Sequence, residues 1–214
     1  MSTTASSLGN SSYIDVLEVV ATEKFIEKPE SNIVVKSLNG DDFEIIRNRK
    51  KQLLIIYPSG IIVEPGNHLT PTQVLKTPRV KFNGDRNKYY LLVMTDPDAP
   101  SRAQPTLREF VHWLVGNIPG DNVCSGETII EYVPSAPPQN SGDHRYTFLI
   151  YEQPGQIEFD EPRISNTSIS GRPNFSIRNF ANKYGFGEPI FGNFYQCQYD
   201  DSVPMIYSML GVVL

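Results

Sequence analysis

The chain has 214 residues, of which 39 % are hydrophobic and 20 % charged, and its 15 Gly and 17 Pro indicate one globular domain rich in turns. Its net charge of −5 excludes a general binder of nucleic acid or of anionic membranes, because such proteins neutralise phosphates with an excess of Lys and Arg. We expect no membrane span and no targeting segment, since no stretch approaches the ~18 consecutive apolar residues of a span and the Ser-rich start lacks an apolar or Arg-rich leader.

The first 51 residues give weak and mixed signals. Apolar residues recur at helical spacing over residues 13–20, which predicts a short amphipathic helix. Residues 28–51 alternate short apolar pieces with polar runs, and they fit either a hairpin turning at Asn39-Gly40 or a surface insertion. The basic run at 47–51 is typical of a solvated loop face, although a docking patch is the other reading.

From residue 52 the pattern of β-strands becomes regular. Each apolar run is short and is bounded by Pro, Gly, Asn or Asp, and the connections leave little room for the helices of a parallel sheet. We therefore predict a mainly antiparallel β-domain with two packed sheets. The predicted strands are Leu53–Tyr57, Ile61–Val63, Tyr89–Thr95, Phe110–Val115, Thr128–Val133 and Arg145–Tyr151.

Two helices are predicted near the end of the chain. The first follows an apolar stripe over residues 177–184, with Ser176 or Asn174 as its N-cap and a glycine after it as its C-cap. The second begins at a proline and covers residues 204–210, with Ser202 before it as the cap.

Four polar residues stand beside stiff loops and are the candidates for chemistry. Asp96 and Asp98 follow an apolar strand, and each proline after that strand forces the preceding residue away from helical geometry. Carboxylates fixed in this way can orient an imidazole or receive an ammonium group. His112 lies within an apolar strand and His144 follows a loop with two prolines. Taken singly, the carboxylates could simply end a strand, and His112 could be a satisfied core residue.

Two segments together resemble the phosphatidylethanolamine-binding protein family, which includes the animal Raf-kinase inhibitor proteins and the plant flowering regulators. The first is TDPDAPSR at 95–102 followed by REFVHW at 108–113. The second is Pro137-Pro138 followed by Gly142 and by HRY at 144–146. Their order and spacing match the family, and shorter matches extend the similarity from about residue 53 to about residue 210. The animal branch is the most similar.

This resemblance implies a two-sheet antiparallel β-sandwich with peripheral helices over residues 52–214. Residues 1–51 are then a flexible or poorly matched extension, longer than is usual for animal members. The resemblance also implies a non-enzymatic protein without cofactor, whose small pocket holds phosphate, phosphoethanolamine or a phosphorylated side chain. The matching pocket positions are Asp96, Asp98, Pro100, Phe110, His112, Ala136, Pro137, His144, Tyr146, Tyr207 and Leu210.

Some positions depart from the animal pattern. Leu107 replaces a tyrosine at the pocket edge, Phe110 replaces a tryptophan, and Ala136 replaces a glycine before the two prolines. The loss of the tyrosine hydroxyl removes one donor to an anion, and the alanine methyl narrows the approach of a ligand to the backbone. In kinase-regulating members a phosphorylatable serine precedes the residue that matches Phe180, but Asn179 stands here, so we expect that switch to be absent.

The expected mechanism uses the histidines to offset the repulsion between an anion and two carboxylates. One carboxylate would orient His112 or His144 towards the phosphate, and the other would take the ethanolamine ammonium. Binding should then weaken above about pH 7 as histidine loses its proton. The expected partners are the phosphatidylethanolamine headgroup and, by regulatory binding in signalling, a protein kinase or a serine protease. A cytoplasmic location is expected because the two cysteines form no CxxC pair and no disulfide framework.

Two other site chemistries remain alternatives. Aspartate and histidine with Ser101 or Ser141 are the components of a serine hydrolase triad, although no GxSxG elbow marks an activated serine. Two histidines and an aspartate could also bind a metal ion, but their spacing matches no ligand motif.

Overall fold

The computed structural model describes residues 33–36, 42–45 and 53–212. Its largest sheet has six strands in the order β4-β10-β9-β6-β7-β8. Neighbouring strands of this sheet pair antiparallel, except that β4 and β10 run parallel. The six strands are β4 (His68–Leu69), β6 (Tyr89–Asp96), β7 (Phe110–Pro119), β8 (Glu127–Ile130), β9 (His144–Glu152) and β10 (Phe191–Cys197).

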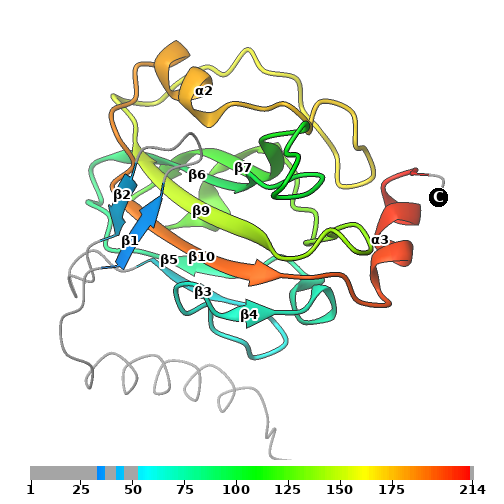
Figure 1. The fold of residues 1–214 in the computed structure, drawn as a ribbon. Coiled ribbons are helices and arrows are strands. Elements are labelled where there is room, and N and C mark those ends of the chain that lie inside the picture. The colour runs from blue at the N-terminus through cyan, green and yellow to red at the C-terminus, as the bar shows by residue number, and fades with distance from the viewer. Residues whose placement is uncertain (1–32, 37–41, 46–52, 213–214) are drawn as a thin grey trace, which may run out of the picture.

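Smaller elements cover the large sheet. Strands β3 (Leu54–Ile56) and β5 (Arg79–Lys81) pair antiparallel and form a second sheet. Figure 1 shows this pair on one side of the six-stranded sheet and helix α2 (Ile177–Lys183) on the other, with helix α3 (Val203–Met209) at one end. In the described part of the chain no helix has the length and apolar character that would let it cross a bilayer.

Alternation along β6 builds a core on each face of the large sheet. Tyr90, Leu92 and Met94 pack towards β3 and β5, together with Phe148 of β9. The intervening residues Leu91 and Val93 pack on the opposite face, against Ile177, Phe180 and Ala181 of α2. Because successive side chains of a strand point to opposite faces, a strand that is buried on both sides becomes a continuous apolar run. The run at 89–95 is explained in this way.

The mostly β fold with two sheets is confirmed, but some predicted strands are wrong. The strand predicted at Ile61–Val63 is reduced to a single bridge between Ile56 and Ile62, because the chain turns straight back on β3. The strand predicted to run to Val133 ends at Ile130. Strand β10 was not predicted, because its inward-facing positions include the buried polar Asn193 and the chain carries Gly192 beside it.

The two C-terminal helices occur where they were predicted. Helix α2 has Ser176 as its N-cap, and the serine hydroxyl oxygen accepts a bond from the N–H of Asn179. Helix α3 begins one residue earlier than predicted. Ser202 is its N-cap residue as predicted, but the serine hydroxyl donates to Asp200 and makes no bond to an N–H group of the helix.

The N-terminal predictions are only partly covered. Strands β1 (Ile33–Lys36) and β2 (Asp42–Ile45) pair antiparallel, as the strands of the predicted hairpin would. Its Asn-Gly turn and the helix predicted at 13–20 lie outside the described residues.

Candidate functional site

The candidate residues come from three strand ends that meet at one end of the large sheet. Asp96, the last residue of β6, pairs with Phe110, the first residue of β7. His144 is the first residue of β9, which pairs along the other side of β6. The loop that leaves β6 contains the buried Pro97 and the half-buried Pro100, which follows a cis peptide bond. Antiparallel pairing therefore gathers residues that are up to about fifty positions apart in sequence.

A β-bulge places His112 on the site's face of the sheet. In the pairing of β6 with β7, Met94 lies opposite Trp113 and Thr95 lies opposite Val111, so His112 is the extra residue. Val111 and Leu114 pack on the α2 face, whereas Trp113 packs on the β3 face. The bulge turns the His112 ring to the same face as Trp113, where it meets Tyr146.

We call Asp96, His112, His144 and Tyr146 the histidine cluster. The His112 ring meets the Tyr146 ring edge-on with centroids 5.1 Å apart, and the His144 ring stacks on Tyr146 at 6.4 Å. All four side chains are buried. Within the described ranges no group of three or more His, Cys, Asp or Glu side chains is placed to hold a metal ion.

Asp96 and His144 form a hydrogen-bonded pair that extends to Ser141. His144 Nδ1 lies 2.7 Å from Asp96 Oδ2, and its Nε2 lies 2.9 Å from Ser141 Oγ. The Ser141 hydroxyl donates to the carbonyl oxygen of Pro138, so its oxygen is free to accept from Nε2–H. Asp96 Oδ1 accepts from the N–H of Asp98. Burial raises the pKa of Asp96 and the His144 contact opposes that shift. The sequence prediction that a carboxylate orients a histidine therefore describes this pair.

His112 is held as a neutral imidazole. Its Nδ1 donates to the carbonyl oxygen of Val133 over 3.0 Å, which leaves Nε2 as an acceptor. Burial lowers the pKa of His112 to about 3. Loss of a proton from His112 near pH 7 is therefore wrong as the source of the predicted pH dependence.

Arg172 binds the backbone of the β-bulge that carries His112, and the sequence did not predict this role. The side chain is fully buried and donates to five backbone carbonyl oxygens. Two of these are the carbonyls of Val111 and His112, at the bulge itself. No sequence signal marks this arginine, because its partners are backbone atoms from three separate segments.

Asp98 does not join the histidines. Its Oδ2 accepts from the N–H and Nε of Arg145 at 3.0 and 2.8 Å, and its Oδ1 accepts from Arg145 Nη2 at 2.7 Å. Arg102 Nε reaches Oδ2 at 3.3 Å, and Arg108 Nη2 lies 3.9 Å from Oδ1. Burial would raise the pKa of Asp98, but the bonds from Arg145 outweigh it and hold that pKa below its usual range. The prediction that the second carboxylate is free for an ammonium group is therefore wrong.

The remaining candidate residues surround the histidine cluster. Phe110 packs on the His112 ring with centroids 4.9 Å apart, and it shares an apolar cluster with Ala136 and Leu210. The Tyr207 hydroxyl of α3 donates to the Ala136 carbonyl over 3.0 Å. Pro100 and the buried Pro137 lie in the loops after β6 and before β9. Their roles in binding stay predictions.

Comparisons with known proteins agree on one family. The family model described as "Phosphatidylethanolamine-binding protein" matches residues 60–195. A Drosophila melanogaster protein named "Putative odorant-binding protein A5" is 38 % identical over 168 residues, which cover 78 % of this chain and 80 % of that protein.

Solved structures share the fold. The structure titled "CG7054 solution structure" is 42 % identical, covers 82 % of this chain and 99 % of its own, and superposes with a TM-score of 0.66. A carboxypeptidase Y inhibitor in complex with its cognate proteinase is 24 % identical, covers 87 % of this chain and 95 % of its own, and has a TM-score of 0.62.

Proposed function

Because the chain belongs to the phosphatidylethanolamine-binding protein family, we propose that its histidine cluster binds a small phosphate-bearing group. The group is phosphate, phosphoethanolamine or a phosphorylated side chain. The observation that carries this proposal is the chain of contacts from Asp96 through His144 to Ser141. It fixes the imidazole Nε2–H of His144 against the oxygen of Ser141, and a phosphate oxygen that displaced Ser141 would accept from this N–H.

The proton count supports an anion at His144. Nε2–H points to Ser141 Oγ because the serine hydrogen is given to Pro138. The contact between Nδ1 and Asp96 then needs one further proton, so the pair is either imidazolium with carboxylate or imidazole with carboxylic acid. Either form has no net charge, and the carboxylate of Asp96 therefore does not repel an incoming phosphate as a free charge would.

His112 supplies the complementary group for a zwitterion. Its Nε2 is an unprotonated acceptor, since Nδ1 carries the hydrogen given to Val133. An ammonium group has three donors and no acceptor, so it suits Nε2 and not the arginine-bound Asp98. Phosphoethanolamine would place its phosphate at His144 and its ammonium at His112.

Titration calorimetry with phosphoethanolamine tests the proposal. We expect weak binding at pH 6 that becomes weaker at pH 8, because any proton lost from the Asp96–His144 pair leaves a net negative charge that repels the phosphate. His144→Ala should abolish binding. His68→Ala is the matched control, because the His68 side chain is 62 % exposed and lies outside the cluster. Full affinity in His144→Ala would refute the site, and equal affinity at both pH values would remove the protonation account.

A protein partner is a compatible extension of this function. The carboxypeptidase Y inhibitor, whose structure was solved in complex with its cognate proteinase, shares the fold of this chain. The family resemblance also implies regulation of a kinase or a protease through the same pocket. Asn179 is exposed on α2 where kinase-regulating relatives carry a phosphorylatable serine. We therefore propose partner binding without that phosphorylation switch.

A serine hydrolase is the second candidate, and one observation favours it. Ser141, His144 and Asp96 lie in hydrogen-bond contact in the order of a catalytic triad, at 2.9 and 2.7 Å. For catalysis the serine proton must pass to Nε2 while Oγ attacks the substrate, whereas here the hydroxyl donates to Pro138 over 2.7 Å. A passive site should not react with a fluorophosphonate probe. Stoichiometric labelling that disappears in Ser141→Ala would establish the hydrolase instead.

A further inference from the structure

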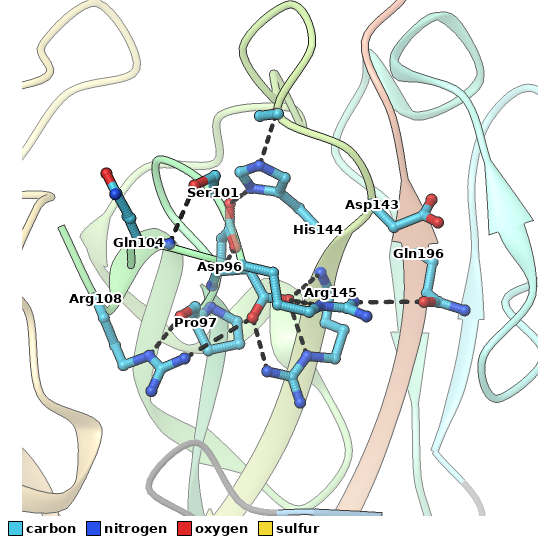
Figure 2. Close-up of polar contacts among 12 residues, drawn as sticks. Asp96, Pro97, Ser101, Gln104, Arg108, Asp143, His144, Arg145 and Gln196 are labelled. Carbon is cyan, nitrogen blue, oxygen red and sulfur yellow. Dashed lines mark hydrogen bonds and ion pairs between the residues drawn. The ribbon is translucent and has the colours of Figure 1, made fainter. Parts of the chain in front are cut away.

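Three arginines converge on one carboxylate, on the side of the 96–98 segment away from His144. We call Asp98, Arg102, Arg108 and Arg145 the arginine cluster. Figure 2 shows the side chains of Arg108 and Arg145 approaching this segment from below, while His144 lies above it. Arg145 Nη2 and Arg108 Nη2 approach the same oxygen of Asp98, at 2.7 and 3.9 Å. The arginine cluster is therefore a separate feature from the histidine cluster.

In the described part of the chain, most of the guanidinium N–H groups of the three arginines have no hydrogen-bond acceptor. The two oxygens of Asp98 already accept three hydrogen bonds from Arg145 and one from Arg102. Arg108 uses Nε on the carbonyl oxygen of Pro97 at 2.6 Å, and Arg102 uses Nη2 on Gln196 at 3.4 Å. Among the described residues, no hydrogen bond uses Nη1 of any of the three arginines. These N–H groups are available to a ligand.

The charge of the arginine cluster is positive although the protein as a whole is acidic. Three guanidinium groups meet one carboxylate, which leaves two positive charges in excess. Two other carboxyl groups lie within electrostatic range of the arginines. Asp96 attracts Arg145, although Asp96 is itself paired with His144. The buried carboxyl of Glu109 attracts Arg108. The arginine side chains stay partly exposed, at 48 % for Arg102, 31 % for Arg108 and 23 % for Arg145. An external anion can therefore reach them.

We propose that the arginine cluster is a second anion site, which binds the phosphate dianion of a phosphorylated side chain on a protein partner. Planar guanidinium groups held in fixed positions match the oxygens of one compact dianion. Two excess positive charges also match its charge of about −1.5 to −2 at pH 7. The exposed Leu107 precedes Arg108 and offers an apolar contact to the residue beside the phosphate.

A peptide is favoured over a membrane surface for two reasons. The net charge of −5 repels an anionic bilayer at long range, and recruitment to a bilayer needs a broad basic surface. The arginines are instead fixed by Asp98, Pro97 and Gln196 within one small region. Rigid donors of this kind favour a single group that enters at one place.

The test uses the full chain with inorganic phosphate and with two short peptides that are identical except for serine or phosphoserine. Phosphate should shift the NMR signals of the Nε–H groups of Arg108 and Arg145, separately from any shift of the His144 ring. The phosphoserine peptide should bind at least about tenfold more tightly than the serine peptide, as expected for hydrogen bonds to a charged group.

Charge-removing variants locate the site. Arg108→Gln should lower the affinity for the phosphoserine peptide about tenfold, and Arg102→Gln about threefold because that side chain is more exposed. Arg79→Gln, on the exposed side of β5, is the matched control and should bind like the wild type. All three variants keep the bidentate Asp98–Arg145 pair, and a urea unfolding curve confirms their folding.

Several outcomes would overturn the proposal. They are phosphate shifts confined to the histidine cluster, equal affinity of the two peptides, or full affinity in Arg108→Gln. Binding to phosphatidylserine vesicles without binding to the phosphoserine peptide would assign the arginine cluster to a membrane instead. The substitution His144→Ala changes no residue of the arginine cluster. Binding of the phosphoserine peptide to this variant therefore distinguishes a failure of the proposed function at the histidine cluster from a failure of the second anion site.

Discussion

Asp96 and Asp98 are two residues apart and both buried, yet their surroundings push them in opposite directions. Burial raises the pKa of Asp96, which has one histidine and one backbone N–H as its partners. Burial would raise the pKa of Asp98 as well, but the hydrogen bonds from Arg145 outweigh it, so the pKa of Asp98 falls below its usual range. The difference shows that identical side chains in one short motif acquire different chemistry from the strands that face them.

The opposite pKa shifts also give the two carboxyl groups different roles, one in each cluster. Asp96 is hydrogen-bonded to His144, whose other N–H we propose as the donor to a ligand. Asp98, whose pKa is held below its usual range, is the carboxylate around which three arginines are arranged. A carboxylate that organises cations cannot also receive a cationic ligand, and this is why the role predicted for Asp98 fails.

The largest effect that would test this contrast is on stability. We expect Asp98→Asn to lower the free energy of unfolding at pH 7 by about 4 kcal/mol, because it leaves partly buried arginines without their carboxylate. Asp96→Asn should cost only about 1 kcal/mol, since asparagine can still accept the N–H of Asp98. Urea unfolding of both variants measures the difference. Equal or reversed costs would break the contrast.

The sign of the pH effect follows for Asp98. Its pKa is lower in the folded than in the unfolded chain, so its contribution is present above the ordinary aspartate pKa of about 3.9 and is lost as pH falls through the folded value.

A smaller effect on stability is expected at Glu109, a third buried carboxyl group. No histidine is among the influences on its pKa, so Glu109 shows the effect of burial more directly than Asp96 does. The Oε2 atom of Glu109 is buried and has no hydrogen-bond partner among the residues that the structure describes, and burial raises the pKa of Glu109 from 4.5 to about 7. A raised carboxyl pKa means that the folded chain binds more protons, so the free energy of unfolding should fall as pH rises from 4.5 to about 7.

Glu109→Gln should remove that loss. We expect this variant to be more stable than the wild type by about 3 kcal/mol at pH 8, and to match it at pH 4, because glutamine stays neutral at both. Urea unfolding across this pH range measures the effect. Glu152→Gln is a suitable control, because Glu152 is 41 % exposed and paired with Lys88 at the surface. A parallel pH profile in wild type and Glu109→Gln would show that burial is not the dominant influence.

The sequence by itself determined the mostly β fold, the two C-terminal helices and the segments that hold the candidate residues. These features depend on local pattern, such as the apolar run of β6 and the prolines after Asp96. It also determined that a carboxylate and a histidine would be brought together.

Only the tertiary structure decided which carboxylate meets which histidine, and in what charge state. The bulge that turns His112 towards Tyr146 depends on the register of β6 with β7. The burial that keeps His112 neutral comes from the packed fold, and the carbonyls that hold Arg172 behind it come from three separate segments. The arginine cluster assembles because β9 places Arg145 against the loop that follows β6. Registers and burial are properties of paired strands, and a single sequence of residues does not contain them until the sheet has formed.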